Sequence, residues 1–554
     1  MRLSGAKIIM ECLLEQGTDT IFGFPGGQIM PLYDALYDYT ASGRIRHILT
    51  CHEQGATHAA DGFARASGRV GVCFATSGPG ATNTVTGIAT AYMDSSPIVV
   101  ITGQVPVSLI GRDSFQEVDI VGITLPITKH SFLCKDVNEL AAAVRHAFRI
   151  AKSGRPGPVL IDVPKNLMTE TAIYKPMAPL PAEVVAPPPA DRIKLLARHL
   201  NEAKRPVLCA GGGVVVSDAS ALLTELAEKA QIPVATTLMC LGAFDRNNPL
   251  SLGMVGMHGE RDANMAVHNA DLLVALGMRF SDRVTGDLRR FAKGATVVHV
   301  DIDRSEIDKN VTSDEHILCD VRDALARLLP LVKANKRRAW NESVRAYRRA
   351  PSANREAEGF GPSQIFPIVY EALGDETIVA TDVGQHQMWT AQKWPFSKPR
   401  RLITSGGLGT MGFGLGAAIG AQIANPGKRV ILFTGDGSFR MNCAELMTVS
   451  AQGLPILVFV LKNNTLGMVR QWQKLFYDRR FSATDLPDVL NYEGLAASFG
   501  LFGRQVADAD GLRDAIREAL ASGRGAVIAC ELSIDENVWP IVPPGDAINN
   551  QLTE

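Results

Sequence analysis

The chain has 554 residues and a formal net charge of −1, with 46% hydrophobic and 20% charged residues. This length is too great for one hydrophobic core and predicts three or four domains, while the composition excludes large-scale disorder. Because 56 Lys and Arg residues nearly balance 57 Asp and Glu residues, no overall positive field is available to bind nucleic acid or an anionic membrane.

Cysteine usage and the N-terminal residues point to a reducing compartment. Nine cysteines are scattered without a C-x-x-C pair, which argues against a disulfide framework or a zinc site. The chain reaches Glu11 and Glu15 before a signal-peptide core could form, and no apolar run approaches the roughly 20 residues of a membrane span. We therefore expect a cytoplasmic protein.

Proline and charge patterns divide the chain. Residues 176–190 hold six prolines and predict an extended linker. Residues 331–360 carry a basic run, which we interpret as a solvated helix face rather than a nucleic-acid site. The predicted order is an N-terminal domain (1–175), the first linker, a central domain (190–330), the second linker and a C-terminal domain (360–554).

Each predicted domain alternates short apolar strands with helical patterns, which is typical of α/β folds with mainly parallel sheets. Residues 75–103 and 406–437 repeat one pattern, a glycine-rich turn, a helix of small residues and an apolar strand. Two copies of one design around a third domain favour a site at the interface between the copies.

In the N-terminal domain, a strand over 46–51 is followed by a helix that opens with His52 and Glu53. An acidic residue in the first helical turn complements the helix dipole, so this role is one interpretation of Glu53. The other is that Glu53 faces a cofactor pocket and binds a heterocyclic nitrogen. The glycines of the next strand-to-helix turn, 77–83, are explained by backbone conformation alone.

In the central domain, a strand over 206–210 runs into Gly211–Gly213, and a strand over 296–300 ends at Asp301. A glycine turn and a later strand-end carboxylate suit the phosphate and ribose of a dinucleotide. The fingerprint is incomplete, so a purely structural turn remains open.

In the C-terminal domain, a strand over 430–434 ends in Gly435–Ser438, and a strand over 455–461 ends in Lys462–Asn464. Asp436 and Asn463 should therefore stand about 5 Å apart at the carboxyl edge of a parallel sheet, where ligands bind. One carboxylate, one amide oxygen and a backbone carbonyl suit Mg²⁺ carrying a diphosphate, whose oxygens meet the amides of the next helix.

A different function remains as the second interpretation of this domain. Gly407, Gly409 and Gly412 match G-x-G-x-x-G, and Asp436 follows at roughly the distance expected in an NAD-dependent dehydrogenase. That interpretation leaves the strand end at Asn463 unexplained.

The spacing from Gly435 to Asn463 resembles the thiamine diphosphate (ThDP) motif. Further motifs occur in family order at 22–27, 52–56, 77–83, 115–117, 155–158, 383–389, 466–472 and 539–545. Over essentially its whole length the chain resembles the catalytic (large) subunit of acetohydroxyacid synthase, also called acetolactate synthase. This resemblance implies pyrimidine-binding and diphosphate-binding domains that flank a Rossmann-like, FAD-binding central domain.

The resemblance also implies an activity, that of a ThDP-dependent transferase (carboligase). Pyruvate is decarboxylated on ThDP, and its hydroxyethyl unit is ligated to pyruvate or 2-ketobutyrate, giving 2-acetolactate or 2-aceto-2-hydroxybutyrate for branched-chain amino-acid biosynthesis. It implies a homodimer or a dimer of dimers with sites at the subunit interface, and a small regulatory subunit as a possible partner. A simple 2-keto-acid decarboxylase, a pyruvate oxidase and a non-catalytic scaffold subunit remain alternatives.

The resemblance assigns catalytic roles residue by residue. Glu53 would activate ThDP, Arg283 would bind the 2-keto-acid carboxylate, and Trp472 would shape the acceptor pocket. Gln116 and Lys165 would approach the reacting centre from the N-terminal domain of a partner subunit.

The resemblance also assigns cofactor ligands. Asp436, Asn463 and the Thr465 carbonyl would hold Mg²⁺. The ThDP set is Pro25, Gly26, Glu53, Asn83, Val383, Gly384, Gln385, His386, Gly409, Met411, Asp436, Gly437, Ser438, Asn463, Thr465, Leu466, Gly467 and Met468. The FAD set is Arg155, Gly211, Gly212, Gly213, Thr236, Leu238, Met239, Met257, His258, Gly259, Gly277, Arg279, Asp282, Arg283, Val284, Asp301, Ile302, Asp320, Val321, Gly406 and Gly407.

Four residues depart from the family pattern. Lys462 stands where Asn is often found, Arg112 where a small Thr is common, Ser281 where Asp is usual, and Gly416 where Pro often starts the helix. None of these departures removes a catalytic role.

Overall fold

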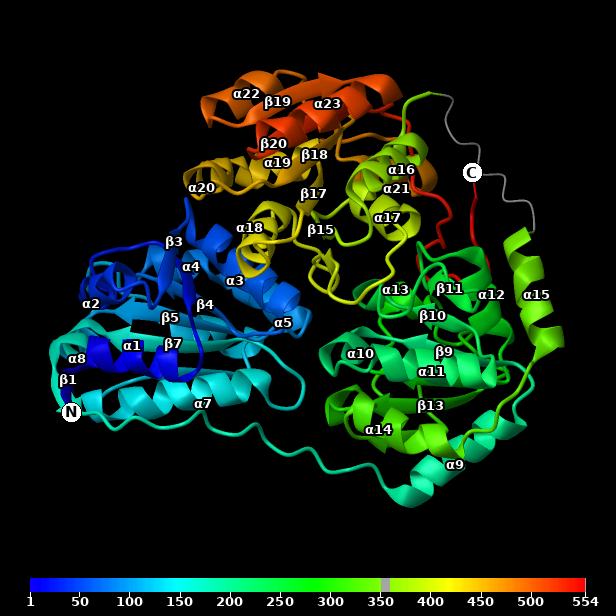
Figure 1. Ribbon diagram of the computed structural model, residues 1–554, viewed down its shortest axis with the longest axis horizontal. Helices are drawn as coiled ribbons and strands as arrows, with labels where there is room; N and C mark the ends of the chain where they lie inside the picture. Colours follow the sequence, from blue (N-terminus) through cyan, green and yellow to red (C-terminus); the bar gives the residue numbers. More distant parts are fainter. Residues whose placement is uncertain (350–358, 554) are drawn as a thin grey trace.

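The computed structural model describes residues 1–349 and 359–553. Residues 350–358 of the predicted second linker and residue 554 of the predicted C-terminal domain lie outside the described residues. Three six-stranded parallel sheets, each with helices packed around it, make up the protein (Figure 1). The predicted α/β class with mainly parallel sheets is confirmed.

The first sheet has the order β3-β2-β4-β5-β7-β6, and a short antiparallel pair, β1 with β8, lies beside it. Its inner strands β2, β4, β5 and β7 are buried, as expected for a parallel sheet covered on both faces, whereas the edge strands β3 and β6 are largely exposed or half-buried. The bounds are β1 Arg2–Ser4, α1 Gly5–Glu15, β2 Thr20–Gly23, α2 Met30–Ala41, β3 Arg46–Leu49, α3 Glu53–Ser67, β4 Gly71–Ala75, α4 Pro79–Asn83, α5 Val85–Met93, β5 Ile98–Gln104, α6 Ile120–Thr124, β6 His130–Leu133, α7 Leu140–Lys152, β7 Val159–Pro164, α8 Lys165–Thr169 and β8 Thr171–Ile173.

The second sheet has the order β11-β10-β9-β12-β13-β14, which is the strand order of a Rossmann fold. Residues 176–189 before it contain no helix or strand. The bounds are α9 Ala190–Glu202, β9 Pro206–Ala210, α10 Gly212–Val216, α11 Ser220–Ala230, β10 Val234–Thr236, β11 Ser251–Met254, α12 Arg261–Asn269, β12 Leu272–Leu276, α13 Asp282–Thr285, β13 Thr296–Asp301, β14 Glu315–Leu318, α14 Val321–Leu328 and α15 Arg338–Arg349.

Helix α15 lies within the stretch predicted as the second linker. Trp340 and Val344 on its inner face are buried, and the Trp340 Nε1 donates a hydrogen bond of 3.0 Å to the Pro206 carbonyl. The apolar stripe on this basic helix is therefore packed onto the central domain, while Arg338 and Arg345 are exposed.

The third sheet has the order β16-β15-β17-β18-β20-β19. Its strands follow the same order along the sheet as those of the first, so the repeat seen in the sequence extends to topology. The bounds are α16 Pro362–Leu373, β15 Ile378–Thr381, α17 Gln385–Lys393, β16 Leu402–Ile403, α18 Gly414–Ala424, β17 Val430–Gly435, α19 Asp436–Asn442, α20 Leu446–Ala451, β18 Leu457–Lys462, α21 Gly467–Phe476, α22 Tyr492–Ser498, β19 Phe502–Val506, α23 Ala509–Ser522 and β20 Ala526–Glu531.

Helices α3 and α18 join the two related domains with their backbones in contact (Figure 1). A Cβ atom on Gly62 would lie 2.1 Å from the Ala417 carbonyl oxygen, and one on Gly420 would lie 1.8 Å from the Ala59 carbonyl oxygen. Only glycine fits at these two positions. This close approach brings the two sheets into one arrangement with a shared hydrophobic core.

No helix in the described part of the chain is both long enough and apolar enough to cross a bilayer. The cytoplasmic location stays a prediction.

Candidate functional site

The carboxyl edge of the third sheet carries the predicted metal ligands. Strands β17 and β18 are parallel neighbours, with Gly435 opposite Leu461, so Asp436 and Asn463 follow adjacent strand ends as predicted. The Asp436 carboxylate accepts hydrogen bonds from the backbone amides of Gly437 (2.9 Å) and Asn464 (2.7 Å). The Asn463 Nδ2 donates to the Gln385 side-chain oxygen (3.2 Å), which orients the Asn463 amide.

This donor set fits a hard divalent cation. Asp436 is buried and burial raises its pKa, so a cation beside it would stabilise the charged form. The buried Asn464 Oδ1 has no hydrogen-bond partner. Among the described residues no three His, Cys, Asp or Glu side chains form a metal group. The site therefore offers one carboxylate with amide and carbonyl oxygens, a set suited to Mg²⁺.

Glycines around this edge leave room that side chains would fill. A Cβ atom on Gly435 would lie 2.9 Å from the His386 ring, and one on Gly437 would lie 2.7 Å from Leu466 and 3.8 Å from Met411. One on Gly467 would lie 1.9 Å from the Gln385 side-chain oxygen. The predicted ThDP residues of the C-terminal domain thus pack against one another.

His386 and Ser438 complete this group. Burial lowers the pKa of His386 to about 3, so its ring is neutral, and its Nε2 is buried without a partner. The Ser438 hydroxyl donates to the Val383 carbonyl (3.2 Å). An unpaired buried ring nitrogen beside a glycine-lined edge indicates a place for a polar ligand.

A pocket of about 850 Å³ lies between the three domains. Its walls include every residue of the predicted FAD set except Gly211, Thr236 and Gly259. These three are not among the residues that line the pocket, and their place in the FAD set stays a prediction. A Cβ atom on Gly211 would lie 2.2 Å from the Gly277 carbonyl oxygen and one on Gly259 2.6 Å from the Gly256 amide, while the Thr236 hydroxyl donates to the Gly253 carbonyl (3.2 Å).

The pocket suits an anionic dinucleotide. The backbone of Gly212 and Gly213, after β9, borders it together with the strand-end carboxylate of Asp301. Arg279 lies in the same wall, and burial lowers its pKa, so an anion beside it would stabilise its charge. The volume lies within the upper part of the range of ligand pockets.

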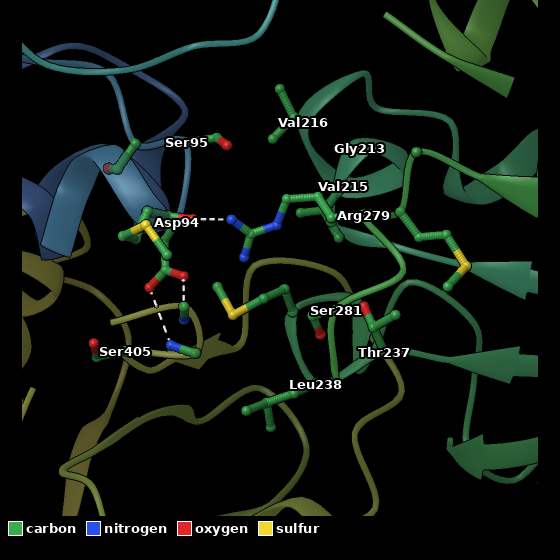
Figure 2. Close-up of a pocket in the computed structure, with 18 of the residues that line it drawn as sticks. Asp94, Ser95, Gly213, Val215, Val216, Thr237, Leu238, Arg279, Ser281 and Ser405 are labelled. Carbon is green, nitrogen blue, oxygen red and sulfur yellow. Dashed lines mark hydrogen bonds between the residues drawn. The ribbon is translucent and has the colours of Figure 1, made fainter. Parts of the chain in front are cut away.

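The pocket wall contains residues that the sequence did not indicate, among them Asp94 and Arg65. The Asp94 carboxylate, which is fully buried, accepts hydrogen bonds from the backbone amides of Gly406 (3.0 Å) and Gly407 (2.7 Å) (Figure 2). It also accepts one from Arg65 (3.1 Å). Arg279 donates to the Met93 carbonyl (2.6 Å). The only local indication in the sequence was the spacing of four residues between Asp61 and Arg65, which predicts an ion pair on a helix. This spacing does not distinguish a buried ion pair from a surface one.

This arrangement argues against the dehydrogenase interpretation. Gly407 opens the G-x-G-x-x-G segment, and its amide and that of Gly406 before it both donate to Asp94 rather than facing an open phosphate site. Helix α18 begins only at Gly414, and its N-terminal amide donates to Asp382 (2.8 Å).

Arg283 and Trp472 meet in the pocket, although they come from different domains. The Arg283 guanidinium carbon lies 5.6 Å from the centroid of the Trp472 ring, and the guanidinium donates to the Met257 sulfur (3.3 Å). The buried Trp472 Nε1 has no partner. Val383, Gly384, Gly409 and Met468 of the predicted ThDP set line the same pocket, which therefore reaches the C-terminal sheet edge.

The N-terminal members of the predicted site share a different sheet edge. Glu53 begins α3 in a buried position, and the Asn83 Nδ2 donates to its carboxylate (2.9 Å). Gly26 follows β2, and a Cβ atom there would lie 2.4 Å from Thr76. Pro25 lies directly before Gly26, in the loop between β2 and α2.

Gln116 and Lys165 lie at this edge as well. Gln116 has a φ of 60°, and a Cβ atom on Gly78 would lie 2.8 Å from its carbonyl oxygen. Lys165 begins α8 directly after β7.

None of these N-terminal residues lines the pocket. The backbone before Glu53 is held instead by Glu445, which accepts from the Cys51 and His52 amides (both 3.1 Å). In the described part of one chain, no hydrogen bond joins the Glu53 group to Asp436 or Asn463.

Comparisons with known proteins agree with this architecture. Three family models match in order: the thiamine pyrophosphate (TPP) enzyme N-terminal TPP binding domain at residues 3–123, the central domain at 193–328 and the C-terminal TPP binding domain at 382–530. Together they match well over half of the chain.

Curated relatives extend over the full length. The acetolactate synthase large subunit of Parasynechococcus marenigrum (strain WH8102) is 49% identical over 98% of this chain and 90% of that protein. The isozyme 1 large subunit of Escherichia coli (strain K12) is 46% identical over 100% and 98%, and the isozyme 2 large subunit is 44% identical over 100% of both. The chain belongs to the acetolactate synthase large-subunit family of ThDP-dependent enzymes and acts as an acetolactate synthase.

Proposed function

We propose that this acetolactate synthase condenses two molecules of pyruvate to 2-acetolactate, and pyruvate with 2-ketobutyrate to 2-aceto-2-hydroxybutyrate, with Mg²⁺ and FAD bound beside ThDP. The observation that carries the proposal is one pocket in which Arg283 of the central domain contacts Trp472 and lies near other residues of the C-terminal ThDP-binding domain. ThDP, when bound, supplies the electron sink for the loss of CO₂. The protein supplies binding, orientation and exclusion of water.

Asp436, Asn463 and the Thr465 carbonyl hold Mg²⁺, which carries the diphosphate. The donor set is hard and contains a single carboxylate, so the cation keeps a net positive charge toward the diphosphate. Val383 and Gly384 line the pocket at this edge, and the neutral His386 with its unpaired, buried Nε2 lies beside Gly384 and Gly435.

Glu53 holds a proton toward the heterocyclic nitrogen of ThDP bound to another copy of the chain. Asn83 fixes the Glu53 carboxylate, while Glu445 fixes the backbone before it. Since no hydrogen bond joins Glu53 to Asp436 within the described residues of one chain, we place Glu53, Gln116 and Lys165 against the C-terminal domain of a partner, which requires at least a dimer.

Arg283 binds the carboxylate of the acceptor keto acid, and Trp472 limits the space beside it. A guanidinium can bind both oxygens of a carboxylate, and its cation is stabilised by the indole face. The FAD in this pocket is structural, since the reaction has no net oxidation or reduction. Because the relatives are named large subunits, we include a small regulatory subunit as a partner.

Product analysis tests the reaction. Purified protein with pyruvate, ThDP and Mg²⁺ is expected to form acetolactate, with 2-aceto-2-hydroxybutyrate when 2-ketobutyrate is added. Acetaldehyde or acetate as the only product would contradict the carboligation step and favour a decarboxylase or an oxidase. Absorbance of extracted cofactors tests FAD, and a flavin-free, fully active protein would contradict its inclusion.

Mixing inactive variants tests the division of the site. Glu53→Gln and Asp436→Asn are each expected to fold and to lose most activity. If each site combines Glu53 of one copy with Asp436 of another, a co-refolded mixture regains about a quarter of the activity, since half of the random dimers carry one intact site of two. If the mixture stays inactive while exchanging subunits, the site belongs to one chain.

A further inference from the structure

Lys462, a departure from the family pattern, has a buried side chain in the structure. It is the last residue of β18, directly before the proposed metal ligand Asn463, and its side chain is only 6% exposed. Its ammonium lies 3.0 and 3.1 Å from the two carboxylate oxygens of Asp488 and 3.3 Å from Glu531. A buried ammonium needs such partners, since burial without them is costly.

Asp488 ends a segment that pairs with the metal-binding turn. We call Asn463–Leu466 the metal turn and Thr484–Asp488 the clamp segment. The Leu466 amide donates to the Thr484 carbonyl and the Leu486 amide donates to the Asn464 carbonyl, both at 2.8 Å. Thr465 and Asp485 form an antiparallel bridge between the two segments.

The clamp segment also reaches the diphosphate side of the site. The Leu486 side chain lies 3.5 Å from the position of a Cβ atom on Gly437, next to Asp436. Arg440 on α19 donates to the Pro487 carbonyl (2.7 Å). The clamp segment is therefore held at Asp488 by Lys462 of β18, which also binds Glu531 of β20, and at Pro487 by Arg440 of α19.

We infer that Lys462 is a positioning residue for the metal site: by binding Asp488 and Glu531 it holds the clamp segment on the metal turn, so that Asn463 and the Thr465 carbonyl are in place before the metal arrives. The inference rests on the proposed metal role of Asp436 and Asn463. A preformed turn binds its metal more tightly, because the cost of ordering it is met by the fold.

Two forces oppose each other here. A cation next to Asn463 repels Mg²⁺, whereas the clamp organises its ligands. Two carboxylates bind the one ammonium, so the local charge of this group is negative and the repulsion is offset. Positioning therefore outweighs repulsion, and removing the Lys462 charge weakens metal binding.

Lys462→Met tests this in metal-free protein and in the presence of metal. The variant retains the buried chain but loses the ammonium. Backbone hydrogen exchange at Leu466 and Leu486 is expected to become about fivefold faster without metal, and the Kd for Mg²⁺, followed by tryptophan fluorescence with ThDP present, about fivefold higher. At saturating Mg²⁺ and ThDP, kcat stays close to that of the wild type.

Asp488→Asn gives a second route to the same link, since Asp488 is 55% exposed and its replacement leaves the fold intact. The double variant is expected to be no worse than Lys462→Met alone, because both changes break one interaction. Arg504→Met is the matched control: it removes an exposed ion pair with Glu518 in the same domain and leaves exchange and Kd unchanged.

Unchanged exchange at Leu466 and Leu486, additive effects in the double variant, or tighter Mg²⁺ binding by Lys462→Met would each overturn the positioning role. The last result would show that repulsion is the main effect. If the wild type shows no response to Mg²⁺, the proposed metal site fails instead, while exchange in metal-free protein still decides whether Lys462 holds the clamp segment.

Discussion

Asp94→Ala is expected to weaken the contact that joins the N-terminal and C-terminal domains at the pocket wall. Asp94 is fully buried and accepts three hydrogen bonds, from Arg65 and from the amides of Gly406 and Gly407. Arg65 retains two hydrogen bonds to Asp61 (2.7 and 2.9 Å) and one to the Thr404 carbonyl (2.6 Å), so it is not left unpaired. Arg65 thus loses one of four bonds and keeps three, whereas the two glycine amides are left without this partner, so these two bonds dominate the loss.

The magnitude follows from those two bonds. A hydrogen bond to a charged group contributes about 1.5–3 kcal/mol, and Gly406 is exposed enough for water to replace part of the loss. The low end of the range gives a destabilisation of about 3 kcal/mol for the pair. For a cooperative unit of 150–250 residues this lowers the Tm by about 6–12 °C.

Thermal unfolding of flavin-free protein measures the effect, and the flavin released on dialysis is expected to increase in the variant. Asp514→Ala removes an exposed ion pair with Arg517 and serves as the control. A Tm shift below about 2 °C, equal to that of the control, would refute the assignment of Asp94 as the link between the domains.

Three further predictions concern other parts of the molecule. Burial raises the pKa of Asp162 from 3.8 to about 7, so between these pH values the native state holds a proton that the unfolded state releases. The free energy of unfolding, measured with urea, is therefore expected to fall as the pH rises from about 4 to 7. Asp162→Asn should flatten this slope, and an unchanged slope would exclude the buried acid. Gly420→Ala should destabilise the protein by about 1–3 kcal/mol in urea unfolding, because the added Cβ meets the Ala59 carbonyl. Gly427→Ala is the control, since a Cβ there has nothing within 4 Å, and equal effects of the two changes would argue against the backbone contact. Arg283→Lys should raise the KM for the keto acid about tenfold with little change in Tm, because an ammonium cannot bind a carboxylate through two parallel hydrogen bonds. An unchanged KM would place the substrate elsewhere.

Local features of this protein were predictable from its amino-acid pattern. Apolar runs that end in glycine, Asp436 or Asn463 identified the strand ends, and the rules of parallel sheets then placed Asp436 beside Asn463, as the structure confirms. The two related domains were also visible as a repeat. These inferences succeed because strand identity and turn chemistry depend on neighbours in the sequence.

Contacts between domains were not predictable in this way. Nothing near Asp94 indicates that it accepts the amides of Gly406 and Gly407, more than 300 residues away. Gly211 and Thr236 fit a cofactor pattern by position, yet they are not among the residues that line the pocket, and their cofactor role stays a prediction. Helix α15 begins in a stretch that reads as a linker, because the partner of its apolar stripe lies in another part of the chain.

Lys462 shows the division most clearly. Its sequence position identified it as a departure beside a metal ligand, but not its effect, because its partners Asp488 and Glu531 come from distant segments. Short-range pattern specifies the elements and the chemistry carried at their ends. Which of those ends face one another depends on long-range packing, such as the backbone contact between α3 and α18, whose free energy is distributed over the whole interface.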